Sequence, residues 1–172
     1  MTRDSFRRKE MGGRKKAVGR AWRRGEAYVG VQALLFGLIA GGPWMDNPRR
    51  GMVSGWMLAL SGLTLTAGGL GSLWALFQLG RNLSVLPHPK AGAALVRSGA
   101  YAWVRHPIYV FVLALGAGWA LLWRSSQAGL AWAALGLLFD LKARREERLL
   151  AERFPDYDAY RRRVRRFIPG LY

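Results

Sequence analysis

Two short groups of residues in this chain could support chemistry. The first brings an arginine, a histidine and two tyrosines together within nine positions, as Tyr101, Arg105, His106 and Tyr109. Such side chains can hold the anionic and polar groups of a cofactor through charge-assisted hydrogen bonds. The same residues, with Pro107 at the start of a helix, are also typical of an aromatic belt at a membrane interface. Both interpretations stay open for this group taken alone.

The second group is the pair Glu146 and Glu147, which lies in a strongly basic stretch. A carboxylate in such a place can bind the ammonium group of a cofactor. The simpler alternative is two surface ion pairs, Glu146 with Lys142 and Glu147 with Arg144, each contributing only about 0.3–0.5 kcal/mol.

Other kinds of site are poorly supported by the composition. The chain has no cysteine and only two histidines, His88 and His106, so we expect no metal site. It also lacks a phosphate-binding loop, a nucleophile elbow and a zinc-protease motif.

Four charge-free runs predict the elements that position these residues: 27–45, 51–80, 107–123 and 125–139. About 20 apolar residues cross a bilayer, so the first two runs predict transmembrane helices, from Tyr28 to Gly42 and from Met52 to Leu79. The last two are shorter and are separated by a polar turn, which predicts a helical hairpin. We therefore expect an all-α polytopic membrane protein.

The second helix of the hairpin is expected to continue into water and to end before Pro155, and residues 157–164 predict one more short basic helix. Glycines of the second span, among them Gly55, Gly62, Gly68, Gly69 and Gly71, would let another helix approach closely. They would also permit a homodimer.

The distribution of the 27 basic residues predicts the orientation. Residues 1–26, 81–106 and 142–172 carry 24 of them, and the segments on the other side carry three. The positive-inside rule then places both termini and the 81–106 loop in the cytoplasm. Basic residues beside membrane spans favour contact with anionic membrane lipids, and we expect no nucleic acid partner, because no base-stacking motif accompanies them.

The two chemical groups, taken together, resemble the isoprenylcysteine carboxyl methyltransferase and phospholipid methyltransferase family of integral membrane methyltransferases. The resemblance covers about residues 78–170 and rests on Arg-His-Pro-x-Tyr at 105–109 with Glu-Glu at 146–147 after one hairpin. Supporting positions flank these two elements: Leu95, Val96, Arg97, Ser98, Gly99, Tyr101, Leu150, Phe154, Tyr157, Tyr160, Val164 and Pro169.

The resemblance implies methylation by S-adenosylmethionine of a lipidic, membrane-resident acceptor, at the inner membrane of a bacterium. It implies a catalytic role for Arg105, His106 and Glu146, and an acceptor contact for Lys142, where relatives often carry arginine. It also implies a cofactor site formed by matching positions, namely Leu95, Val96, Tyr101, His106, Pro107, Ile108, Tyr109, Glu146 and Glu147. Of the two glutamates, we expect Glu146 to matter more for the cofactor.

The resemblance also suggests a division of the chain. Residues 1–26 would form a basic cytoplasmic tail, 27–80 two transmembrane helices, and 81–172 the methyltransferase core. Two departures from the family pattern are Ala100, where proline is usual, and Phe111, where glycine is frequent. Two alternatives stay open: a sterol-type membrane reductase that uses NADPH, and a non-catalytic scaffold that binds lipid through its basic segments.

Overall fold

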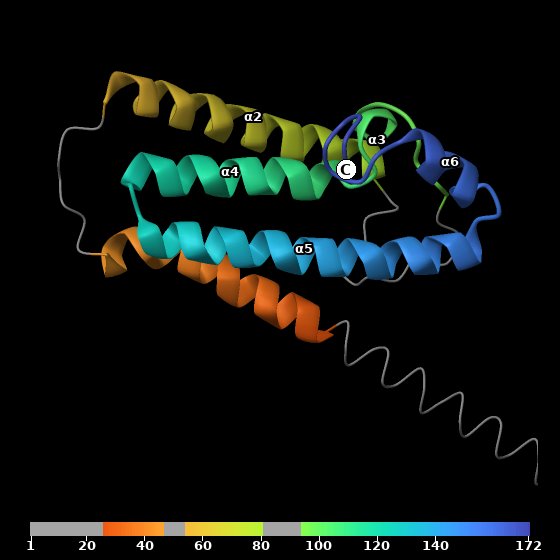
Figure 1. Ribbon diagram of the computed structural model, residues 1–172, viewed down its shortest axis with the longest axis horizontal. Helices are drawn as coiled ribbons and strands as arrows, with labels where there is room; N and C mark the ends of the chain where they lie inside the picture. The colour runs from red at the N-terminus through yellow and green to blue at the C-terminus, as the bar shows by residue number, and fades with distance from the viewer. Residues whose placement is uncertain (1–25, 47–53, 81–93) are drawn as a thin grey trace, which may run out of the picture.

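The computed structural model describes residues 26–46, 54–80 and 94–172, which form helices and no β-strand (Figure 1). The helices in chain order are Glu26–Met45, α2 (Gly55–Leu79), α3 (Ala100–Trp103), α4 (Pro107–Trp123), α5 (Ser126–Arg153) and α6 (Tyr157–Arg163). The helix Glu26–Met45, orange in Figure 1, is called here the 26–45 helix. The predicted all-α fold is therefore confirmed for the described residues.

The 26–45 helix and α2 are long and apolar enough to cross a membrane. Only 17% and 22% of their most apolar windows are buried in the protein, so most of their large side chains face outward. Trp56, Leu63, Leu70 and Phe77, for example, recur every seven residues of α2 with exposures of 64% or more. A core helix of a soluble protein would be largely buried, whereas outward apolar side chains suit contact with lipid.

The helix ends agree in part with the sequence predictions. The 26–45 helix was expected to stop at Gly42, but it continues through Pro43 to Met45. The second span begins at Gly55, and the expected start at Met52 lies outside the described residues, as do His88 and nearly all of the 1–26 tail. The hairpin is present as α4 and α5, and α5 ends at Arg153, two residues before Pro155.

One end of the bundle holds the turn between α4 and α5 and is called the turn end. Ser125 caps α5 by accepting a hydrogen bond from the backbone N–H of Ala128. The Asp46 carboxylate, at the end of the 26–45 helix, accepts from Ser125, Ser126 and the backbone N–H of Gln127. Asp46 thus joins the 26–45 helix to the start of α5.

Glycines allow α2 and α4 to pack closely along their length. A Cβ atom at Gly68 would overlap the backbone of α4 at Leu115, and one at Gly71 would overlap the Phe111 ring. Phe111, the residue that departs from the family pattern, therefore fills the space that Gly71 leaves. Gly55, Gly62 and Gly69 have nothing within 4 Å of such an atom, so only part of the expected glycine set is used in this packing.

The hydrophobic core lies between the 26–45 helix, α4 and α5. It is formed by Ile39, Ala131, Leu135 and Phe139, with Tyr109 packed against it. Beyond this core α5 runs on past the start of α4, and α3, α6 and residues 164–172 gather around it (Figure 1). This second end of the bundle is called the site end.

Candidate cofactor site

The entry to the site is fixed by contacts between α2 and α3. The side chain of Gln78 accepts a hydrogen bond of 2.7 Å from the backbone N–H of Ala100, the first residue of α3. Gly99 has a φ of 58°, and a Cβ atom there would overlap the Gln78 side chain. Glycine suits this position because its backbone adopts positive φ without strain and leaves room for Gln78.

The chain after α3 is held by the C-terminal segment. Val104 forms an isolated parallel bridge with Arg165. The backbone N–H groups of Arg105 and His106 donate to the carbonyls of Arg165 and Arg166 at 2.8 and 3.2 Å. Pro107 then begins α4, where a missing N–H costs no helical hydrogen bond.

Glu147 is the most heavily paired carboxylate at the site end. Its side chain is 7% exposed and accepts hydrogen bonds from Arg105 and from Nε and Nη2 of Arg166, at 2.9–3.1 Å. His106 Nε2 lies 3.1 Å from the same carboxylate. The alternative of a surface pair between Glu147 and Arg144 is wrong, because Arg144 instead binds Asp140 at 2.7 Å.

The pKa of Glu147 reflects these partners. Burial alone would raise it, but the hydrogen bonds from His106 and Arg166 and the charge of Arg105 hold it well below its usual range. The hydrogen bond to Glu147 likewise raises the pKa of Arg166. Glu147 is therefore ionised, and a buried carboxylate with two guanidinium partners acts as a structural centre.

Glu146 has a different environment from its neighbour. Tyr109 donates a hydrogen bond of 2.7 Å to Glu146 Oε1, while Oε2 lies 3.6 Å from His106 Nδ1, beyond hydrogen-bond length. The Tyr109 ring stacks on His106 and on Phe139, with centroids 5.3 and 4.4 Å apart. The carboxylate is thus held through one oxygen, and among the described residues its other oxygen has no donor within hydrogen-bond length.

Lys142 lies one turn before Glu146 and points towards the 26–45 helix. It is 4% exposed, donates to the Gln32 side chain at 3.1 Å, and places its ammonium 5.5 Å from the centre of the Tyr109 ring. A surface ion pair between Lys142 and Glu146 is therefore also wrong, since Lys142 is buried. The predicted contact of Lys142 with an acceptor stays a prediction.

The other predicted residues surround this cluster. Tyr101 is buried, and its carbonyl accepts a hydrogen bond of 2.6 Å from the Tyr160 hydroxyl, whose pKa burial raises to about 12. Pro107 is buried and Ile108 is half-buried, while Leu95 and Val96 lie half-buried in the non-helical segment before α3. The structure thus brings His106, Tyr109, Glu146 and Glu147 into contact, and the roles assigned to all nine positions remain predictions.

Several further residues at the site end contact the cluster without a distinct signal in the sequence. Arg166 bridges Glu147 and Asp140, and the Tyr172 hydroxyl also donates to Asp140. The Phe167 ring lies 5.9 Å from that of His106. No sequence signal separates Arg166 from the other arginines at 161–165, because only the fold shows which one turns inward.

The apolar outer faces, the close-packed spans and the polar cluster at one end define an integral membrane protein with a candidate site beside its apolar region. Residues 60–152 match the isoprenylcysteine carboxyl methyltransferase family. The chain belongs to this family, a family of membrane methyltransferases, which confirms the resemblance seen in the sequence.

Two curated relatives are similar over most of the chain. The nickel-cobalt-cadmium resistance protein NccN of Alcaligenes xylosoxydans xylosoxydans is 33% identical over 83% of this chain and 62% of its own length. The cobalt-zinc-cadmium resistance protein CzcN of Cupriavidus metallidurans is 34% identical over 87% of this chain and 62% of its own length. The chain thus spans about three fifths of the length of these relatives.

Proposed function

We propose that this protein transfers a methyl group from S-adenosylmethionine to a hydrophobic acceptor that resides in the membrane. The observation that carries the proposal is the Glu146 carboxylate, which Tyr109 holds by one oxygen at the end of an apolar helical bundle. Family membership supports the reaction class. The identities of the cofactor and of the acceptor are part of the proposal.

The side chains at the site end fit such a cofactor. Glu146 Oε2, for which the described residues offer no donor closer than 3.6 Å, would bind the cofactor's ammonium group. The backbone and ring of His106, the ring of Tyr101 and the aliphatic side chain of Ile108 would form the wall of the cofactor pocket. Tyr157 adds a buried hydroxyl for which the described residues provide no hydrogen-bond partner. A buried hydroxyl of this kind suits a polar ligand.

When bound, S-adenosylmethionine would supply an electrophilic methyl group for in-line attack by the acceptor, with S-adenosylhomocysteine as the leaving group. The protein's task is then to align the groups and exclude water. His106 suits a positioning role, because its two ring nitrogens face Glu147 at 3.1 Å and Glu146 at 3.6 Å. Arg105 also suits positioning, since it donates to Glu147 and to the carbonyls of Arg161 and Val164. A carboxylate acceptor would need no base, whereas an amine would have to lose a proton.

We further propose that the site end faces the cytoplasm, at the inner membrane of a bacterium. The excess of basic residues in segments 1–26, 81–106 and 142–172 supports that orientation. Sequence similarity to NccN and CzcN, which are named for metal resistance, supports a role for the methylated product in that process. Glu147 is paired with arginines rather than left open to a cation, which favours methylation over metal binding here.

Calorimetry with the purified protein in detergent tests the proposal against its rivals. We expect S-adenosylmethionine to bind and NADPH not to bind. Binding of NADPH alone would favour a sterol-type reductase. Failure of both cofactors to bind would favour a lipid-binding scaffold, which deletion of residues 1–24 should disable while leaving a methyltransferase active.

A further inference from the structure

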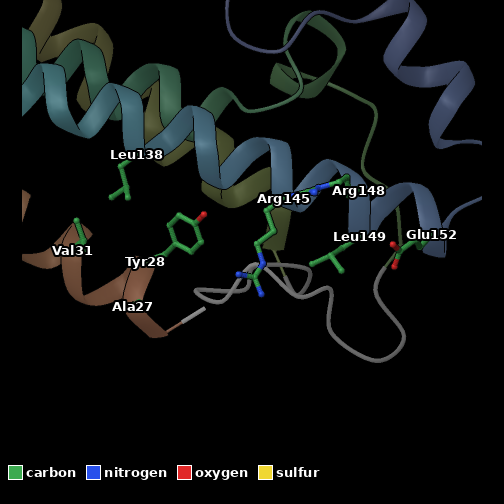
Figure 2. Close-up of a pocket in the computed structure, with 8 residues that line it drawn as sticks. All are labelled: Ala27, Tyr28, Val31, Leu138, Arg145, Arg148, Leu149 and Glu152. Atoms are coloured by element: carbon green, nitrogen blue, oxygen red, sulfur yellow. The ribbon is translucent and has the colours of Figure 1, made fainter. Parts of the chain in front are cut away.

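A groove separate from the Glu146 cluster lies between the 26–45 helix and the part of α5 at the site end (Figure 2). Its volume is about 580 Å³. Tyr28 and Val31 line it from the 26–45 helix, and Leu138, Arg145 and Leu149 line it from α5. Figure 2 shows the side chains of Leu138 and Arg145 projecting from α5 to the side on which that helix lies.

The polarity of the groove changes along the bundle axis. Val31 and Leu138 form its inner part, and Leu138 packs against the hydrophobic core. Arg145, Arg148 and Glu152 form its outer part, beyond the charge-free run that ends at residue 139. Because α5 rises about 1.5 Å per residue, Arg145 lies roughly 10 Å further along the axis than Leu138. The groove therefore offers apolar contacts at the depth of the spans and charged contacts at the interface.

The charges of the outer part favour an anion. Among the described residues that line the groove, Arg145 and Arg148 carry positive charge and Glu152 carries negative charge. The Arg145 guanidinium lies 5.8 Å from the centre of the Tyr28 ring, so it is placed at the groove. Arginine presents a planar set of donors that matches phosphate oxygens and tolerates partial burial.

We propose that this groove binds an anionic phospholipid, with the phosphate held by Arg145 and Arg148 and one acyl chain lying along Val31 and Leu138. An amphiphile of this kind matches the groove in charge and in the direction of its polarity. A free phosphate ion would leave the apolar part unused, and a zwitterionic lipid would bring a cation towards two arginines. The site needs no cofactor, so it does not rest on the proposed methyl transfer.

Native mass spectrometry of the full chain in an uncharged detergent tests this inference. The protein is titrated with dioleoylphosphatidylglycerol, with dioleoylphosphatidylcholine and with inorganic phosphate, in the absence of S-adenosylmethionine. We expect phosphatidylglycerol to bind about tenfold more tightly than phosphatidylcholine, as a charge-assisted contact allows. Millimolar inorganic phosphate should not displace it. Equal binding of the two lipids, or displacement by phosphate, would overturn the assignment.

Two variants probe the two parts of the groove, and a third serves as their control. Arg148→Gln should weaken phosphatidylglycerol binding about tenfold. Val31→Trp should weaken both lipids by filling the apolar part, and because Val31 is 45% exposed the fold should accept the larger ring. Arg144→Gln removes the same charge from the same turn of α5 but from a residue paired with Asp140, outside the groove. An equal loss in Arg144→Gln and Arg148→Gln would show that only general charge attraction is at work.

Discussion

Tyr109 and Glu146 are 37 positions apart in the sequence, and the Tyr109 hydroxyl donates a 2.7 Å hydrogen bond to Glu146 Oε1. This contact joins the start of α4 to the extension of α5. It fixes one oxygen of the carboxylate, and we propose that the other oxygen binds the cofactor. The adjacent Glu147 is instead enclosed by Arg105, Arg166 and His106. The carboxylates of Glu146 and Glu147, neighbours on α5, thus have different hydrogen-bond partners.

The first prediction compares the effects of substituting Glu146 and Glu147 on the free energy of unfolding. Glu147→Gln should lower the free energy of unfolding by about 3 kcal/mol, because it leaves two guanidinium groups without their shared anion. Glu146→Gln should cost less than about 1 kcal/mol, since its amide oxygen can still accept from Tyr109. Thermal unfolding in detergent measures both. Equal melting temperatures for the two variants would contradict the structural role of Glu147.

A second prediction concerns pH. In the folded protein the pKa of Glu147 lies below its ordinary value of 4.5, so the ionised carboxylate stabilises the fold throughout the neutral range. Its contribution is lost as the pH falls through the lowered pKa. The difference in melting temperature between the native protein and Glu147→Gln should therefore be constant from about pH 8 to pH 6 and should shrink below about pH 4. A difference that disappears at neutral pH would show that Glu147 is not held ionised.

The third prediction tests the packing of α2 on α4. Gly71→Ala should destabilise the protein by about 1–3 kcal/mol, because the added methyl group overlaps the Phe111 ring. Gly69→Ala is the matched control: its methyl group would meet nothing within 4 Å, and alanine favours the helix. Similar losses in both variants would mean that the two helices do not pack in this register.

A fourth prediction addresses the hydroxyl that holds Glu146. Tyr109→Phe keeps the ring that stacks on His106 and Phe139 but removes the donor to the carboxylate. Affinity for S-adenosylmethionine should fall about threefold to tenfold, with little change in the melting temperature. Calorimetry and thermal unfolding of the same preparation check the two parts. Unchanged affinity would argue that the orientation of Glu146 does not matter for the ligand.

The helical fold was largely predictable from the sequence. Charge-free runs locate helices because a membrane-spanning helix must exclude charge. Pro155 predicts the end of α5 because proline has no backbone N–H to donate and its ring clashes with the preceding helical turn. The end of the 26–45 helix was not predictable, because Asp46 joins it to α5 through contacts distant in sequence. Gly68 and Gly71 pack against α4, whereas Gly69 does not, because it lies on a face of α2 that does not contact α4. The sequence does not show which face that is.

The candidate site was predictable in location but not in its connections. Arg105–Tyr109 and Glu146 lie at the two open ends of one hairpin, so the sequence alone indicates that they approach each other. The choice of Glu147, rather than Glu146, as the buried partner depends on Arg166, which folds back from the C-terminal segment. Successive side chains on a helix point about 100° apart around its axis, so Glu147 faces the arginines and Glu146 does not.

Transfer of a labelled methyl group tests whether the protein is a methyltransferase. The purified protein is incubated with S-adenosylmethionine carrying a radioactive methyl group and with a total bacterial lipid extract, and the organic phase is then counted and separated. The native protein should transfer label to a lipid-soluble product, and Glu146→Gln, with an unchanged melting temperature, should lose most of that activity. Absence of labelled product with the native protein would rule out the proposed methyl transfer, and equal labelling by Glu146→Gln would rule out the role proposed for Glu146.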